Sequence, residues 1–261
     1  MLNAPINGTD SRIIPEPTSH PLIILLCLGC TEGARQTRAP PPTPTGSPAA
    51  APTPSPAPLG GDLQRPNELY EPLVATLRAR GAEVIICPDT GSVIRFAWSR
   101  CPHAIIVVDD RLFRTDTAGD RVLQDVVNSL TAYVRTGGRL IFRPSFDEYG
   151  SLQPMFRQRF GLDWQIRGHF SIPVRRGDWL DFVREDLLEC FPEEYHATGV
   201  FIDSAAPAFP MYFSTGILRE TNSRLVSSAA GRVGDSGWLL YCGDDIMQRE
   251  ADQIIFLFCG V

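Results

Sequence analysis

Charged side chains follow several of the apolar runs in this sequence. Two acidic doublets each end such a run, and they comprise Asp109, Asp110, Asp244 and Asp245. Glu32 follows the first apolar run, and Arg143 follows the fourth. In a parallel α/β sheet, ligands bind beyond the carboxyl ends of the strands. In a functional interpretation, these side chains converge on one edge of a sheet and form a polar pocket for a small ligand or a divalent ion.

A structural role is the alternative for these carboxylates. Aspartate routinely caps helices and solvates the entrances of loops. We give this interpretation the greater weight, and we retain the residues as candidates for ligand binding only.

Ser145 and His169 are the residues that suggest nucleophilic catalysis. A serine hydroxyl becomes a nucleophile when a histidine takes its proton and an acid orients that histidine. Ser145 comes shortly after the fourth apolar run, but the preceding Pro144 lacks a backbone donor and has a fixed φ. The sequence shows neither a tight glycine-flanked turn nor an acid partner. We interpret Ser145 as a loop serine, predict no catalytic residue, and keep both residues as binding candidates.

The cysteines indicate neither redox nor metal chemistry. The chain has seven, an odd number, and several lie inside apolar runs, which is typical of buried free thiols in a reducing compartment. Cys27 and Cys30 have redox spacing, but Cys27 lies inside an apolar run and not at the start of a helix. No second pair has the spacing of zinc ligands. We predict no metal and no cofactor.

Composition excludes several classes of partner. The formal net charge is −6, and the basic residues are scattered, so no basic surface is predicted to attract nucleic acid or an anionic membrane. The apolar run 21–29 is shorter than the roughly 20 residues that a membrane span requires. It also lacks the basic flank of a signal peptide. We predict a cytoplasmic protein whose partner is a small molecule or another protein.

The first part of the chain alternates between short apolar runs and amphipathic segments. Strands are predicted at 22–28, 83–87, 104–108 and 139–142, and helices at about 67–81, 92–100 and 120–136. This alternation favours right-handed crossovers and a parallel sheet. We predict an α/β fold of three layers, flavodoxin-like, with a mostly parallel sheet flanked by helices.

The second part of the chain is less regular. Its predicted helices are 156–164, 179–191 and 250–258, and its predicted strands are 170–174, 199–203, 225–229 and 238–242. We assign residues 21–261 to one domain and residues 1–20 to a disordered tail.

A segment rich in Pro, Ala and Thr interrupts this domain at about 31–66. It has few large apolar side chains that could be buried in a core, so we predict a disordered insertion. A linker between two domains is the alternative, but too few residues precede it to form a domain. A docking site for aromatic-lined peptide-binding domains is a further alternative, because the stretch Pro40-Pro-Pro-Thr-Pro44 is compatible with a polyproline helix.

Several short segments, taken in order, carry a resemblance to a known fold. They are Val108-Asp-Asp-Arg-Leu112, Tyr133-Val-Arg-Thr-Gly-Gly138, Arg167-Gly-His-Phe170, Phe191-Pro-Glu-Glu-Tyr195, Tyr241-Cys-Gly-Asp-Asp245 and Phe258-Cys-Gly260. In this order the chain resembles the class I glutamine amidotransferase-like fold, which includes the ThuA-like trehalose-utilisation proteins. More narrowly, it is similar to a set of uncharacterised, mostly fungal proteins of that fold.

The resemblance implies a fold but not the family's glutaminase chemistry. Active amidotransferases of this kind have a cysteine nucleophile at a tight turn, with histidine and glutamate partners. Here the fourth strand is followed by Arg143-Pro-Ser-Phe-Asp147, and no histidine follows His196. These departures argue against glutaminase activity.

We therefore hypothesise a non-catalytic domain that binds a small ligand or a protein partner. The alternative hypothesis is a ThuA-like hydrolase or sugar-active enzyme that uses polar residues at the edge of the sheet. Those residues would be Asp109, Asp110, Arg143, His169 and Asp244.

Overall fold

The computed structural model describes ten parts of the chain. They are residues 20–26, 66–87, 89–108, 112, 121–143, 152–177, 191–204, 209–216, 224–244 and 249–261. The predicted tail at 1–20 lies almost wholly outside these residues, and the predicted insertion at 31–66 lies outside them except for Pro66. The elements are, in order, β1 (Leu22–Leu26), α1 (Pro66–Ala79), β2 (Glu83–Cys87), α2 (Thr90–Ser99), β3 (Ala104–Val107), α3 (Arg121–Arg135), β4 (Arg139–Phe142), α4 (Leu152–Met155), the π-helix η5 (Phe156–Phe160), β5 (Trp164–Arg176), β6 (Glu194–Ser204), β7 (Phe209–Ser214), β8 (Leu225–Val233), β9 (Gly237–Cys242) and α6 (Arg249–Cys259).

The first half of the sheet is parallel. Its strands lie in the order β2-β1-β3-β4-β9, and each pairs in parallel with its neighbour. Strands β1 and β3 read Leu-Ile-Ile-Leu-Leu and Ala-Ile-Ile-Val, and their residues are buried except for the partly exposed Leu22. Continuous apolar strands of this kind occur where helices cover both faces of a sheet.

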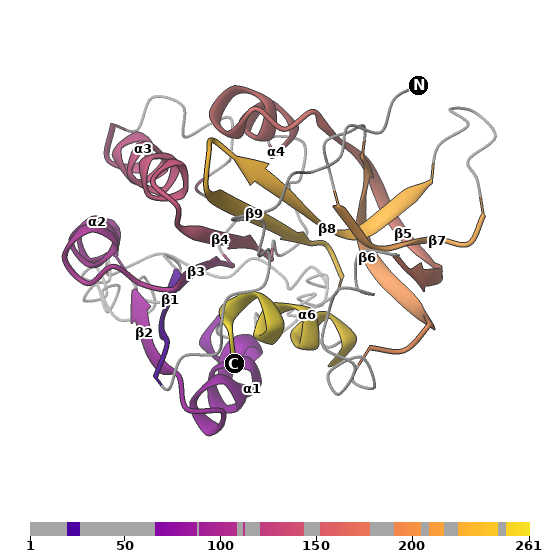
Figure 1. Cartoon of the computed structure of the whole chain (residues 1–261), viewed down its shortest axis with the longest axis horizontal. Coiled ribbons are helices and arrows are strands. Elements are labelled where there is room, and N and C mark those ends of the chain that lie inside the picture. The colour runs from indigo at the N-terminus through magenta and orange to yellow at the C-terminus, as the bar shows by residue number, and fades with distance from the viewer. Residues whose placement is uncertain are drawn as a thin grey trace, which may run out of the picture.

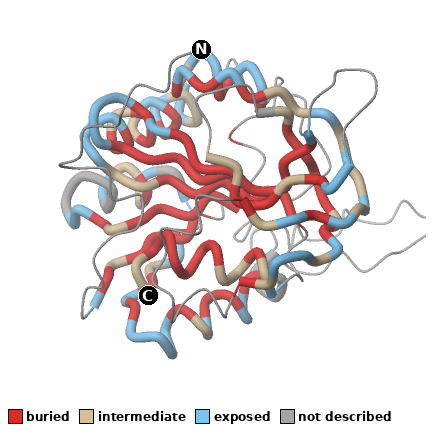
Figure 2. The backbone as a smooth tube through the Cα atoms, turned by 45° about the vertical axis from the view of Figure 1, so that its right-hand side comes forward, coloured by how far each residue is buried: buried red, intermediate tan, exposed pale blue. Residues whose placement is uncertain are grey.

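Helices α1 and α6 pack on one face of this half, and α2, α3 and α4 pack on the other (Figure 1). Successive residues of β1 divide between the two cores, because side chains alternate across a strand. Ile23 packs with the α1 and α6 side, whereas Ile24 packs with the α2 and α3 side. Figure 2 shows the buried strands running through the middle of the molecule, with the exposed residues on the outer surface.

The second half of the sheet is antiparallel. Strand β9 pairs with β8, and the order continues β8-β6-β5-β7. Strand β7 also pairs with β8, so β5, β6, β7 and β8 form a closed ring of antiparallel pairings. From Arg167 to Pro173, β5 alternates between exposed and partly buried residues, as in a strand with one face in water.

The prediction of a three-layer, flavodoxin-like, mostly parallel sheet is wrong. Of the nine strand pairings among the described residues, four are parallel and five are antiparallel. The parallel pattern of the first half does not continue, because residues after Gly161 form long strands joined without crossover helices in the described parts. Antiparallel neighbours need only a short connection, whereas parallel neighbours need a crossover.

Two individual elements were also mispredicted. The helix expected over 156–164 ends at Phe160, where Gly161 takes a left-handed conformation with φ of 72°, and Trp164 already begins β5. Strand β7 was not predicted. The helix expected at 179–191 falls almost wholly outside the described residues.

No helix in the described part of the chain is both long enough and apolar enough to cross a bilayer.

Four free cysteines are described. Cys87, Cys242 and Cys259 are buried as expected, whereas Cys101 is exposed.

Two glycines allow β6 to lie against the end of β9. Val200 donates its backbone N–H to the Gly243 carbonyl at 2.8 Å, and Gly199 forms a bridge with Asp244. A Cβ atom at Gly199 would overlap the Gly243 carbonyl, and one at Gly243 would overlap the Val200 carbonyl. The absence of both side chains therefore permits the backbone contacts that bring Asp244 against β6.

The substitution Gly243→Ala tests this close approach. We expect it to lower the free energy of unfolding by about 1–3 kcal/mol, because the added methyl group overpacks a site bounded by backbone. Chemical denaturation would measure the loss. Gly216→Ala is the control, because a Cβ atom there would meet nothing within 4 Å, and it should change stability by less than about 0.5 kcal/mol. Equal losses in the two variants would contradict the account.

Candidate functional site

Two charged side chains are buried at the carboxyl ends of neighbouring strands. Arg143 follows β4 and Asp244 follows β9, and both are fully buried. Because Phe142 pairs in parallel with Tyr241, the two strands end at the same edge of the sheet. Burying a charge is costly unless that charge is paired and hydrogen-bonded, so the partners of these two residues decide what the site can do.

Arg143 forms an ion pair with Asp252. One terminal nitrogen of the Arg143 guanidinium group contacts an oxygen of Asp252, which lies in the first turn of α6. The Asp252 side chain is 22% exposed. Burial raises the pKa of Asp252 above its ordinary value, although Arg143 acts in the opposite direction. Desolvation thus outweighs attraction at this carboxylate, as is common for buried ion pairs.

Asp244 accepts a hydrogen bond from Tyr195. The Tyr195 hydroxyl donates to Oδ2 of Asp244 at 2.5 Å, a short distance typical of a charge-assisted bond. Tyr195 comes from β6, so this bond ties the antiparallel ring to the end of β9. The pKa of Tyr195 is well above its ordinary value, chiefly because of burial and secondarily because the Asp244 carboxylate disfavours a phenolate beside it.

The thiol of Cys242 interacts electrostatically with Asp244, Arg143 and Asp252. It is fully buried, and its nearest hydrogen-bond acceptor is the carbonyl of Ala251 at 3.8 Å. Burial raises the pKa of the Cys242 thiol, and Asp244 adds to this effect while Arg143 opposes it. A thiol held in its neutral form is neither a nucleophile nor a metal ligand. We name Arg143, Tyr195, Cys242, Asp244 and Asp252 the sheet-edge cluster.

The structure brings together two of the predicted site residues, Arg143 and Asp244. His169 is exposed on β5, where its backbone lies opposite Val200, so it does not share the buried surroundings of the other two. The remaining predicted residues lie outside the described part of the chain. They are Glu32, Asp109, Asp110, Ser145 and Asp245.

Sequence reasoning missed Tyr195 and Asp252. Tyr195 belongs to a segment that carried the family resemblance, but nothing in its local pattern points to Asp244, 49 positions away. Asp252 was hidden for a different reason. An acidic residue in the first turn of a helix is ordinary, since it complements the helix dipole, so its pairing with a residue 109 positions earlier left no signal.

The charged groups of the sheet-edge cluster have partners within the cluster. Its arginine faces a carboxylate, its second carboxylate accepts from a phenol, and both Arg143 and Asp244 are shielded from solvent. Among the described residues, no group of three or more His, Cys, Asp or Glu side chains is arranged to hold a metal ion. In this state the arrangement can hold α6 and β6 in place, and its two fully buried charged groups, Arg143 and Asp244, are not presented to an external ligand.

A serine and a histidine contact each other elsewhere, on the outer face of the antiparallel ring. The Ser171 hydroxyl lies 3.0 Å from Nε2 of His196 and 2.8 Å from the Thr198 hydroxyl. Both Ser171 and His196 are exposed. A nucleophile also requires donors for the oxyanion and an oriented base, which these contacts do not supply.

No family model and no curated protein matches the chain. Among solved structures, it is similar to the exo-β-1,4-mannosidase Op5Man5 from Opitutaceae bacterium strain TAV5, with a TM-score of 0.44 and 15% identity over 92% of this chain and 33% of that one. It is also similar to a catalytic mutant of Gan42B, a GH42 β-galactosidase from G. stearothermophilus. The TM-score is 0.47, and the identity is 11% over 95% of this chain and 30% of that one. For the mmIFT52 N-terminal domain, the TM-score is 0.48, and the identity is 11% over 74% of this chain and 90% of that one.

The chain thus spans about a third of the length of either glycosidase. Likenesses this distant assign neither its fold nor its activity. The structure itself defines a mixed-sheet domain with a buried cluster in which Arg143 pairs with Asp252 and Tyr195 with Asp244.

The ion pair can be tested by a double-mutant cycle. Asp252→Ala should lower the free energy of unfolding by about 3 kcal/mol, because it leaves the guanidinium group of Arg143 buried without its carboxylate. Adding Arg143→Met should recover part of that loss, since a neutral side chain then fills the site. Urea denaturation of the four proteins gives the coupling energy.

The exposed pair of Arg100 and Glu83 provides the matched control. Its side chains are 53% and 60% exposed and lie 3.4 Å apart, so Glu83→Ala should cost less than about 1 kcal/mol. Strictly additive losses at Arg143 and Asp252 would contradict a buried pair.

The bond between Tyr195 and Asp244 should appear in the pH dependence of stability. Because folded Tyr195 keeps its proton above the ordinary tyrosine pKa of about 10, the unfolded chain binds fewer protons there, and stability falls as pH rises from about 9 to 11. Tyr195→Phe removes one contributing group, so its stability should fall less steeply across the same range. Denaturation midpoints at successive pH values would show the difference, and identical slopes would refute the assignment.

Proposed function

We propose that this chain is a non-catalytic domain that binds a small ligand or a protein partner. The observation that carries the proposal is the closure of the sheet-edge cluster. Arg143 and Asp244 occupy the edge where an α/β sheet commonly places its ligand, but they are fully buried and engaged with Asp252 and Tyr195. Charged groups held in this way constrain the positions of α6 and β6 and leave recognition to other surfaces.

The resemblance to amidotransferase-like proteins agrees with this proposal and remains a prediction. The residues quoted for that resemblance include Tyr195 and Asp244, which form a hydrogen bond here. Their pairing offers a structural reason for both residues without invoking glutaminase chemistry.

The hydrolase alternative has weaker support. It requires Arg143, His169 and Asp244 to share one concave pocket. His169 is exposed, whereas the other two are buried, so no geometric observation favours that alternative over binding.

Thermal unfolding against a panel of metabolites tests the proposal. A ligand at about 100 times its dissociation constant should stabilise the protein by about 2.7 kcal/mol, which gives a measurable shift in melting temperature. Each hit is then incubated with the protein and followed by NMR. We expect binding with no change in the ligand, and His169→Ala should bind the same hit.

Two results would count against the proposal. Conversion of a hit into product, lost in His169→Ala, would establish catalysis and overturn it. If no metabolite raises the melting temperature, the proposal that the chain binds a small ligand is contradicted. Binding of a protein partner would then be the hypothesis to pursue.

A further inference from the structure

We propose that the cavity between α3 and η5 is a binding site for a small oxyanion, such as the phosphate or carboxylate group of a metabolite. The cavity has a volume of about 390 Å³. Its polar lining consists of Asn128, Thr131, Arg135, Thr136, Gln158 and Arg159. This inference deepens the proposed binding function, on which it rests, by naming a site and a class of ligand.

The charge of this cavity favours an anion. Two of its lining residues, Arg135 and Arg159, are cationic, and none of the described residues that line it carries a carboxylate. The protein as a whole has a net charge of −6, so a doubly positive cavity is a local exception. The ion pairs among the described residues join Arg100 to Glu83, Arg143 to Asp252 and Arg167 to Asp203, and thus involve neither arginine of the cavity.

The hydrogen-bond acceptors of the two arginines are neutral. Arg159 donates to Oδ1 of Asn128 at 3.0 Å and to Oε1 of Gln124 at 2.8 Å. Arg135 donates to the backbone carbonyl of Arg159 at 3.1 Å. These bonds orient the guanidinium groups without cancelling their charge. Because each guanidinium carries five N–H groups, most of the donors of Arg135 and several of those of Arg159 remain for a ligand.

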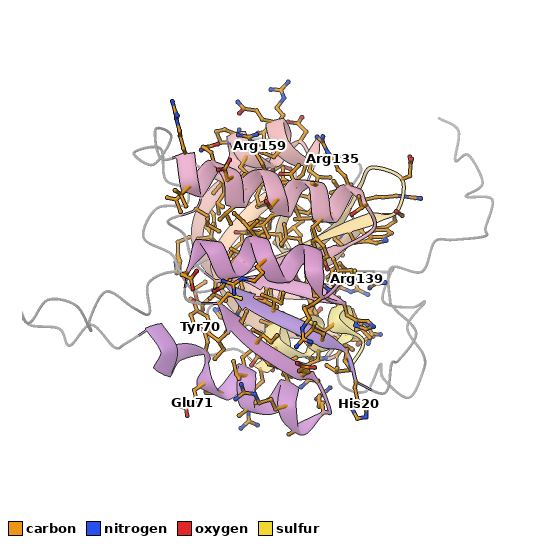
Figure 3. The ribbon with its side chains drawn as sticks, turned by 90° about the vertical axis from the view of Figure 1, so that its left-hand side faces the viewer. His20, Tyr70, Glu71, Arg135, Arg139 and Arg159 are labelled. Carbon is orange, nitrogen blue, oxygen red and sulfur yellow. The ribbon has the colours of Figure 1, made fainter. Side chains whose placement is uncertain are left out.

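Figure 3 shows Arg135 and Arg159 close together at the same end of the molecule, above α3. Each comes from a rigid element. Arg159 belongs to the π-helix η5, which its buried end residues Phe156 and Phe160 anchor against Phe142 at ring-centre distances of 5.8 and 5.9 Å. Isolated π-helical turns are rare and often occur at functional sites, and here the turn carries a charged residue into the cavity.

A purely structural role explains only part of this arrangement. Arg135 lies in the last turn of α3, where a cation complements the partial negative charge of the helix carbonyls. The partial charge at the C-terminus of a helix is equivalent to about half of one negative elementary charge, so it balances only part of the charge of Arg135. The second cation, Arg159, donates its side-chain hydrogen bonds to the amide oxygens of Asn128 and Gln124. Asp125, an acidic residue one turn before Asn128, does not line the cavity.

Calorimetric titration of the full chain with inorganic phosphate and, separately, with citrate tests the site, with sodium chloride at matched ionic strength as the reference. We expect saturable binding of at least one of the two, competitive if both bind. Arg135→Gln should weaken it about tenfold or more, as expected for the loss of charge-assisted hydrogen bonds. Arg159→Lys keeps the charge but loses the planar fork, and it should weaken binding less than Arg135→Gln.

Arg121→Gln is the matched control, because Arg121 is an exposed arginine at the opposite end of α3. It should bind within twofold of the wild type. Circular dichroism establishes that each variant is folded. If Arg135→Gln fails this check, Arg135→Met replaces it, because it also removes the guanidinium group and should weaken binding to the same extent.

Binding of neither oxyanion above the chloride reference would overturn the site, as would equal loss in Arg121→Gln and Arg135→Gln. These outcomes differ from failure of the proposed function. A metabolite hit that persists without oxyanion binding overturns only this site, whereas turnover of a hit overturns the non-catalytic role and leaves the oxyanion result standing.

Discussion

Strand β9 joins the two halves of this protein, and the rest of the structure depends on its pairings. On one side it pairs in parallel with β4, and on the other it pairs antiparallel with β8. All six of its residues are buried. Trp238, Leu240 and Cys242 face the core beneath α1 and α6, while Leu239 and Tyr241 face the core beneath α3. A strand shared by both cores leaves little freedom for one half to move independently of the other.

The charged cluster at the end of β9 follows from this junction. Once β9 has brought β4 and β6 to the same edge, Arg143 and Asp244 are enclosed by protein on every side and must find partners there. Helix α6 supplies Asp252 and β6 supplies Tyr195. Such pairs add less net stability than their geometry suggests, because desolvation offsets much of the attraction. Their effect is to penalise any arrangement in which α6 or β6 is displaced.

Small residues make the enclosure possible. Gly199 and Gly243 let two backbones approach, and Gly231 of β8 leaves space that Leu162 and Trp164 fill. Gly237, at the start of β9, lies against the Val134 carbonyl of α3. The packing of the antiparallel ring on the parallel half therefore depends on where side chains are absent as much as on where they are present.

The sequence by itself determined the local elements of the first half and the position of two charges. Runs such as Ile23–Leu26 and Ala104–Val107 are typical of strands covered on both faces, and Arg143 and Asp244 each follow such a run. Only the tertiary structure decided that the sheet turns antiparallel after β9, because pairing direction depends on connections between strands and leaves no mark on a short apolar strand. Likewise, only the tertiary structure decided that these charges face Asp252 and Tyr195 and not a ligand. Those partners are 109 and 49 positions away, and contacts over such separations exist only once the chain has folded.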